Sequence, residues 1–258
     1  MVEFAEWPLQ LIFAVSLALI LAASEFGHWL GQRAGERHNE NITTLEASML
    51  GLLALMISFT FAMALTRFDA RRDAVLNEAN AIGTTALRAR LLPSPHSSDC
   101  LALLRDYVKV RLDITRRVPS NAELNEAIAR SNAIQEALWQ QAKAMAAKDT
   151  GLVPTGLFIQ SLNDMIDNHE KRLTAARNRV PNIALVALYA IAAIAIAFTG
   201  YAGAAEPRRW RPGVYITATL IAGMILLIQD IDRPGAGFVR VSQQPMIDVA
   251  ASLASYRD

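Results

Sequence analysis

Long uncharged stretches are the clearest pattern along the chain. No Asp, Glu, Lys or Arg occurs in residues 47–66, 181–205 or 212–229. A fourth apolar stretch begins at Trp7 and carries only Glu25 before it ends at Phe26. Because a helix of about 20 apolar residues crosses the hydrocarbon core of a bilayer, each stretch predicts one transmembrane helix. The predicted spans are 7–26, 45–66, 181–201 and 213–228.

Between the second and third spans the pattern becomes that of helices in water. Charged residues follow Thr66 with no proline before Pro93, so the second membrane helix is predicted to continue to about Leu92. Beyond the prolines, apolar residues recur at helical spacing, and no alternating strand pattern is present. Three further helices are predicted at 98–117, 121–148 and 156–180. The predicted fold class is an all-α membrane protein with four transmembrane helices and a helical-bundle soluble domain inserted between the second and third.

This pattern predicts four successive parts of the chain. Residues 1–66 hold the first two spans and a short polar loop, and residues 67–180 form the soluble domain, with the extended second span and three more helices. Residues 181–230 hold the third and fourth spans, and residues 231–258 form a C-terminal tail with no strong pattern. The charged content of 19% lies below the roughly 25% of typical soluble domains, which supports the membrane assignment.

Four spans place both termini and the 67–180 domain on the same side of the bilayer. Lys and Arg residues close to the predicted membrane boundaries are more frequent on that side than on the other, so the positive-inside rule favours a cytoplasmic domain. The short Arg208-Arg209-Trp210-Arg211 turn favours the opposite orientation, because short loops weigh most in the rule. We expect the soluble domain and both termini to be cytoplasmic.

Composition and motifs exclude several classes of function. The net charge of +1 gives no electrostatic reason to expect nucleic-acid binding. The single cysteine, Cys100, excludes an intrachain disulfide and a multi-cysteine metal site. No nucleophile elbow, zinc-protease helix, phosphate-binding loop or dinucleotide-binding turn occurs in the sequence. We therefore expect no catalytic residues, no metal and no cofactor, and the lipid bilayer is the first expected partner.

Polar residues on the last soluble helix permit alternative interpretations. His169 lies on an apolar stripe, where a hydrogen-bonded core histidine is a more ordinary role than a functional one. Asp164, Asp167 and Glu170 recur three residues apart and could either bind a cation or form a solvated helix face. We expect the core role for His169 and the solvated face for the three acids.

The second span carries the most informative pattern for function. Bulky apolar and hydroxyl side chains recur on it at helical spacing, so one face could line a pore in an oligomer, with Phe59 as a hydrophobic constriction. Ordinary helix–helix packing uses the same residue types and is the alternative. The candidate pore-lining residues are Met56, Ser58, Phe59, Thr60, Met63 and Thr66.

Charged residues also gather where the second and fourth spans end. On the predicted topology these two groups lie on the same side of the bilayer, and charges at this depth are costly unless they are paired or hydrated. We predict contacts between the two groups, which would form either a structural clamp or an ion-attracting vestibule. The residues of this charge collar are Arg67, Arg71, Arg72, Asp230, Asp232 and Arg233.

Three groups of motifs carry a family resemblance. The first comprises Phe59-Thr60-Phe61-Ala62 and Arg67-Phe68-Asp69-Ala70-Arg71-Arg72. The second comprises Asn77-Glu78-Ala79-Asn80-Ala81-Ile82-Gly83-Thr84 and the stretch from Arg88 through Leu92-Pro93. The third combines Asp232-Arg233-Pro234, Gly237 and Val241-Ser242 through Pro245. In these motifs the chain resembles the bacterial bestrophin-like DUF4239 family over most of its length, which implies a multi-pass protein of the bacterial inner membrane.

The resemblance also implies an activity. Bestrophins are pentameric anion channels whose second span lines the pore with a hydrophobic neck, and whose helices between spans two and three form a cytosolic vestibule. Ile57, Phe59 and Phe61 loosely match that neck, whereas the acidic calcium clasp of animal bestrophins has no counterpart here. We therefore expect a homo-oligomeric, anion-selective ion channel, pentameric by analogy, whose partners are inorganic ions. The alternative is a non-conducting membrane scaffold or sensor whose helical domain binds a partner protein.

Overall fold

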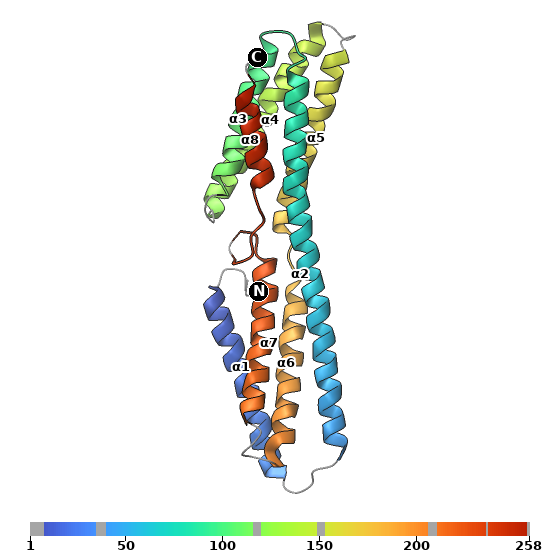
Figure 1. The fold of residues 1–258 in the computed structure, drawn as a ribbon, viewed down its shortest axis with the longest axis vertical. Helices are drawn as coiled ribbons and strands as arrows, with labels where there is room; N and C mark the ends of the chain where they lie inside the picture. Colours follow the sequence, from blue (N-terminus) through green and yellow to red (C-terminus); the bar gives the residue numbers. More distant parts are fainter. Residues whose placement is uncertain are drawn as a thin grey trace. The chain divides into compact units, whose positions relative to one another are not determined.

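The computed structural model describes residues 8–34, 40–115, 120–148, 153–205, 211–235 and 237–256. Within these ranges the regular structure is entirely helical (Figure 1). The helices, in chain order, are α1 (Leu9–Ala34), α2 (Glu40–Ala89), α3 (His96–Asp113), α4 (Asn121–Lys148), α5 (Val153–Arg177), α6 (Asn182–Ala202), the short 3-10 helix η2 (Gly203–Ala205), α7 (Arg211–Asp232) and α8 (Gln244–Ser255). The basic turn at 208–211 falls largely outside the described residues.

Four helical stretches are long and apolar enough to cross a membrane. They are α1, the Ile42–Ala89 part of α2, the Val153–Ala202 stretch that contains α6, and α7. Their positions agree with the four spans predicted from the uncharged stretches. In such helices every backbone group between the ends is bonded within the helix, which is the condition for a chain to enter hydrocarbon.

Helix α2 is much longer than a membrane span, with 50 residues in one unbroken helix. No proline interrupts residues 40–92, and the helix ends at Ala89, followed by a turn that leads into Pro93. The predicted continuation into the polar segment is therefore observed. The helix begins at Glu40, just over one turn before the predicted span starts at Leu45, because no helix breaker lies between the two residues.

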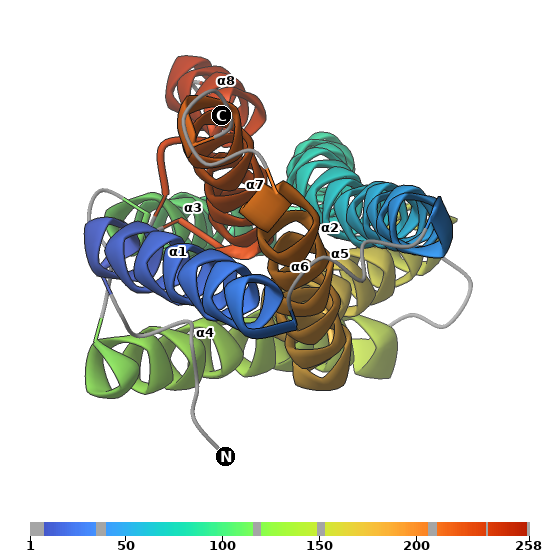
Figure 2. The ribbon, with the colours of Figure 1, turned by 90° about the horizontal axis from the view of Figure 1, so that it is seen from below.

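The chain forms two compact units, which we call the first unit and the second unit. The first unit comprises Met1–Phe68, Arg179–Arg233 and Gly237–Val239, and the second unit comprises Asp69–Asn178, Pro234–Ala236 and Arg240–Asp258. Helix α2 contributes to both. In the first unit α1 packs along α6 and α7, which lie side by side (Figure 2).

Close backbone contact joins α1 to α6 in the first unit. A methyl group at Gly27 would overlap the carbonyl oxygen of Ala197, and one at Gly200 would overlap the carbonyl oxygen of Ser24. Small residues at such crossings allow membrane helices to approach closely and gain dispersion contacts. A polar bond adds to this packing, since the Ser16 and Tyr189 hydroxyls lie 2.6 Å apart.

The second unit is a bundle with its own apolar core. The later half of α2 packs with α3, α4 and α5 around side chains that include Leu104, Leu138 and Phe158, all fully buried. Helix α8 completes this core through Met246 and Leu253. The expectation of a tail without strong pattern was therefore wrong: Met246, Val249 and Leu253 recur at helical spacing and bury one face of a helix.

Several helix ends differ from the predicted ones for identifiable reasons. Helix α5 stops at Arg177 rather than at Val180, because the residue before Pro181 is disfavoured in helical geometry. Helix α7 extends to Asp232 and so contains both acids that were expected to follow it. Helix α1 continues past Phe26 to Ala34, which shortens the predicted polar loop.

Candidate pore-lining face of α2 and the clusters around it

One face of α2 is exposed along the apolar part of the first unit. Phe59 is 60% exposed, and Leu52 and Leu55 lie on the same exposed side. The opposite face carries Leu53 and Ala64, which are buried against the other helices of the unit. Among the described residues of the first unit this face is exposed, so it is available either to lipid or to a neighbouring copy.

The structure divides the six candidate pore residues between these faces. Ser58, Phe59 and Thr66 are on the exposed face. Met56 and Met63 are partly buried and pack against the apolar core of the first unit. Thr60 is only 1% exposed, so it does not lie on the exposed face of α2. Ser58 and Thr60 are two residues apart, which places them about 200° apart around a helix.

The hydroxyl groups of this segment are bonded to their own helix. Ser58 Oγ donates to the carbonyl of Ala54 at 2.9 Å, and Thr66 Oγ1 donates to the carbonyl of Ala62 at 2.9 Å. A hydroxyl has one donor hydrogen and two acceptor lone pairs. With its hydrogen occupied, each oxygen presents lone pairs outward, which suits a cation or water hydrogen better than an anion.

Acidic residues follow on the same side of the helix. Asp69 and Asp73 are exposed on α2 and continue the helical spacing set by Phe59 and Thr66. Arg71, in contrast, is buried, at 5% exposure. Of the other two collar arginines on α2, Arg67 is partly buried and its Nη1 donates to the carbonyl of Met63 at 3.3 Å, whereas Arg72 is exposed.

The two acids of the charge collar bind backbone groups at the end of α7. Asp230 accepts hydrogen bonds from the amides of Phe238 at 2.7 Å and Val239 at 3.0 Å. Asp232 accepts from the amide of Val180, with both carboxylate oxygens within 3.1 Å. Both carboxylates are nearly buried. Their role in the first unit is to clamp two chain segments onto the last turn of α7, and a contact between them and the arginines of α2 remains a prediction.

The second unit contains a buried ionic cluster around Glu78, which we call the Glu78 cluster. Glu78 is fully buried and accepts from Arg172 Nη1 at 2.6 Å. Arg111 Nε lies 3.1 Å from the other carboxylate oxygen. The Tyr107 hydroxyl donates to Glu78 at 2.7 Å and lies 2.9 Å from His169 Nδ1. Three separate helices, α2, α3 and α5, thus meet at one carboxylate.

Electrostatics hold Glu78 ionised inside this core. Burial alone would raise the pKa of Glu78, but the hydrogen bond with His169 and the charges of Arg111 and Arg172 outweigh it and hold the pKa far below the ordinary value of 4.5. Burial also raises the pKa of the Tyr107 hydroxyl, and the neighbouring Glu78 carboxylate raises it further. The Tyr107 hydroxyl therefore stays protonated at neutral pH and donates a hydrogen bond to Glu78.

The Glu78 cluster fits a structural role better than a catalytic one. Its groups are fully or nearly buried, so no substrate reaches them. Arg172 also links the cluster to the residue directly before α8, because its Nη2 donates to Gln243 Oε1 at 2.9 Å. The sequence predicted His169 as a hydrogen-bonded core histidine, and this is confirmed. The rest of the cluster was missed, although Arg172 follows His169 by three residues on the same apolar stripe.

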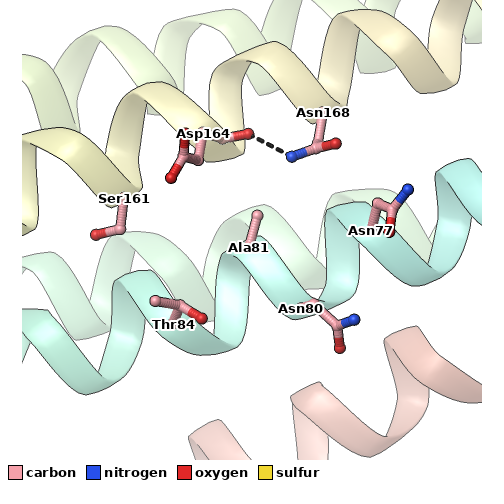
Figure 3. Close-up of a pocket in the computed structure, with 7 residues that line it drawn as sticks. All are labelled: Asn77, Asn80, Ala81, Thr84, Ser161, Asp164 and Asn168. Carbon is pink, nitrogen blue, oxygen red and sulfur yellow. Dashed lines mark hydrogen bonds between the residues drawn. The ribbon is translucent and has the colours of Figure 1, made fainter.

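A small polar pocket lies between α2 and α5 in the second unit (Figure 3). Its volume is about 340 Å³, and amide, hydroxyl and carboxylate side chains line it. Asn77, Asn80 and Thr84 come from α2, and Ser161, Asp164 and Asn168 from α5. The Asn168 amide donates to the backbone carbonyl of Asp164. With a single carboxylate among its lining residues, the pocket has too few anionic ligands to define a metal site.

The acidic face of α5 has the solvated character that was expected. Asp164, Asp167 and Glu170 are all exposed. Among the described residues no group of three or more His, Cys, Asp or Glu side chains is arranged to hold a metal ion.

Fold and surface together define a class: an all-helical protein with four candidate membrane spans and an exposed apolar face on the second of them. The bestrophin-like domain family matches residues 12–246 of the sequence. The chain therefore belongs to the bestrophin-like family. A search of curated protein sequences found no match.

Solved structures of similar fold extend over almost the whole chain. A bacterial bestrophin homologue from Klebsiella pneumoniae, solved by zinc phasing, has a TM-score of 0.68 at 13% identity and covers 95% of this chain and 97% of its own. A tyrosine-to-alanine variant of a bacterial bestrophin homologue from the same organism has a TM-score of 0.68 at 14% identity, covering 93% and 96%. A structure described as a membrane protein has a TM-score of 0.65 at 14% identity, covering 95% and 97%. At these identities the likeness shows a shared fold.

Proposed function

We propose that the chain is a subunit of a homo-oligomeric ion channel in the bacterial inner membrane, with the exposed face of α2 lining the pore. Membership of the bestrophin-like family supports the channel class. The single observation that carries the pore assignment is the exposure of Phe59, at 60%, in the middle of an apolar helix that packs on its other side.

Assembly of several copies would give this face a function. Around a central axis, one α2 from each copy would place Ser58, Phe59 and Thr66 toward the lumen. The ring of Phe59 side chains would form an apolar constriction, where a narrow pore loses water and blocks ions. Pentameric assembly follows from the resemblance to bestrophins. Lipid-facing packing of the same face is the alternative, and it would leave no conduction path.

The sign of the conducted ion has two candidates. Anion selectivity is the property that the family resemblance implies. Cation selectivity is favoured by the chemistry of α2 itself, since the donor hydrogens of Ser58 and Thr66 are occupied and exposed Asp69 and Asp73 follow. Rings of carboxylates select cations and rings of basic side chains select anions. We propose that the exposed face of α2 passes cations in preference to chloride.

The second unit would form the water-exposed domain of each subunit on the cytoplasmic side. Its bundle has a closed apolar core and a buried ionic cluster, as expected for a domain that folds in water. The non-conducting scaffold or sensor is the competing function. It would use this same domain as a binding surface for a partner protein, and no pore would be needed.

Ion flux in proteoliposomes tests the proposal. The purified full chain is reconstituted in a lipid bilayer with a potassium chloride gradient, and the reversal potential is measured. We expect a current that reverses near the potassium equilibrium potential. A reversal near the chloride potential would establish an anion channel and refute the cation assignment. The absence of current over a range of pH and voltage, with a co-purified stoichiometric partner, would support the scaffold.

A further inference from the structure

Residues 237–239, which follow α7 in the chain, are bound to Asp230 and expose an aromatic ring. The Asp230 carboxylate binds the amides of Phe238 and Val239, and Gly237 packs against Asp230 so closely that a side chain there would overlap the carboxylate. Val239 packs against the apolar core of the first unit. Phe238, directly before it, is 80% exposed. The backbone amides of Phe238 and Val239 are both bonded to Asp230, so the fold itself keeps the Phe238 ring exposed.

An exposed cation is held at the same end of α7. Asp232 binds the amide of Val180 through both of its oxygens, which fixes the position of Arg179 directly before it. Arg179 is exposed. Burial lowers the pKa of Arg233, and the nearby positive charge of Arg179 lowers it further, while the Asp230 carboxylate opposes this shift. Two positive charges, those of Arg179 and Arg233, therefore lie at the end of α7, where the carboxylates of Asp230 and Asp232 are bound to backbone amides.

The depth of this pair follows from the sequence of α7. Residues 212–229 are uncharged, and Asp230 is the first charged residue after them. If α7 crosses the bilayer, Asp230 and Asp232 mark the level at which the hydrocarbon core ends. Segments that bind these two carboxylates must lie at the same level. Apolar rings enter the boundary between headgroups and acyl chains, while basic side chains are attracted to anionic headgroups.

We propose that Phe238 and Arg179 form an interfacial anchor that binds the surface of an anionic phospholipid bilayer. The ring of Phe238 inserts among the headgroups, and Arg179 binds lipid phosphate beside it. This inference depends on the membrane placement of α7 in the proposed function but not on ion conduction. A neighbouring copy of the chain is the other possible occupant of this surface, and the experiment separates the two.

Depth-dependent fluorescence quenching tests the anchor. The native cysteine needs no replacement, because Cys100 is fully buried and burial, with the nearby Asp99 charge, raises the pKa of its thiol to about 12. A Phe238→Cys variant of the full chain is labelled with an environment-sensitive fluorophore and reconstituted in phosphatidylcholine and phosphatidylglycerol vesicles. Lipids with a nitroxide at the headgroup, at a shallow acyl position or at a deep acyl position are then compared.

Two controls bracket the expected result. Leu220, 66% exposed in the apolar part of α7, should report the deep position as Leu220→Cys. Glu136, exposed on α4, should report water as Glu136→Cys. We expect the label at 238 to lose most fluorescence with headgroup and shallow nitroxides, and little with the deep one. An Arg179→Gln substitution in the labelled variant should reduce this loss in anionic vesicles and leave it unchanged in purely zwitterionic ones.

Two outcomes would overturn the anchor. If the label at 238 behaves like the one at 136, the ring is in water. If it self-quenches in fully labelled protein and recovers on dilution with unlabelled subunits, a neighbouring copy covers it. In either case deep quenching at Leu220→Cys would leave the membrane placement intact, so that only the anchor fails. A water-like label at 220 would refute the anchor and the membrane placement together.

Discussion

At the scale of single residues, Glu78 is the most constrained position in the second unit. Its carboxylate pairs with both Arg111 and Arg172 in the core, and Tyr107 and His169 also lie against it. A buried ion pair is weak evidence for stability as such, because removing charges from water is costly. Removing only the carboxylate would destabilise the fold, since the guanidinium groups of Arg111 and Arg172 would then be buried without their negative partner.

The substitution Glu78→Gln tests this constraint. The amide has nearly the same shape but no charge, so we expect a loss of about 3–5 kcal/mol in the free energy of unfolding. Thermal unfolding of the detergent-solubilised full chain, compared with the unsubstituted protein, measures it. Glu170→Gln is the matched control, because Glu170 is exposed on α5, and it should change little. Equal effects of the two substitutions would contradict the role of the Glu78 cluster.

The pKa of Glu78 also predicts a pH dependence. Its pKa in the folded chain is held below the ordinary value of 4.5, so folding favours the ionised form. The stabilisation is therefore complete above that ordinary value and is lost as the pH falls below it toward the folded pKa. We expect the melting temperature to fall between about pH 5 and pH 3, and to fall less in Glu78→Gln. Identical pH profiles for the two proteins would refute this assignment.

At the scale of elements, the packing of α1 on α6 depends on missing side chains. Gly27→Ala would place a methyl group into the backbone of Ala197, and neither helix can yield without losing other contacts. We expect a loss of about 1–3 kcal/mol or more in stability, as for overpacked cores. Gly223→Ala on α7 is the control, because nothing lies within 4 Å of a methyl group there. The melting temperatures of both variants in detergent measure the difference, and an unaffected Gly27→Ala would show that the crossing is loose.

The exposed face of α2 predicts an effect of Phe59 on conduction. If the ring forms a hydrophobic constriction, Phe59→Ala widens it and lowers the barrier to wetting, so the ion flux should rise several-fold. Leu220→Ala is the matched control, since this α7 residue is similarly exposed and is assigned to lipid. An active channel whose flux is unchanged by Phe59→Ala would contradict the constriction.

At the scale of the whole molecule, the uncharged stretches predicted the four candidate spans because a bilayer imposes a length and a polarity on any helix that crosses it. Helix ends were harder to predict. Asp230 and Asp232 resemble the residues that follow a span, yet they lie inside α7, because distant backbone amides satisfy their charges. Such partners are set by tertiary structure and leave no local signal.

Among the candidate functional residues, too, those with a local sequence pattern were predictable and those set by tertiary contacts were not. Helical spacing correctly grouped Ser58, Phe59 and Thr66 on one face, but it also admitted Thr60, because a list of residue types does not show which side of a helix packs. The Glu78 cluster was missed because its charges come from three helices far apart in the sequence. The apolar spacing of Met246, Val249 and Leu253 was present in the sequence, and α8 could have been predicted from it.

The central claim is that the exposed face of α2 borders the ion path of an oligomer. Current block by a charged thiol reagent tests it most directly, with single cysteines placed along α2 and the buried Cys100 left in place. We predict block at Ser58→Cys and Phe59→Cys, and none at Ala64→Cys, which is fully buried on the opposite face. An active channel that is blocked at 64 but not at 58 and 59 would contradict the account.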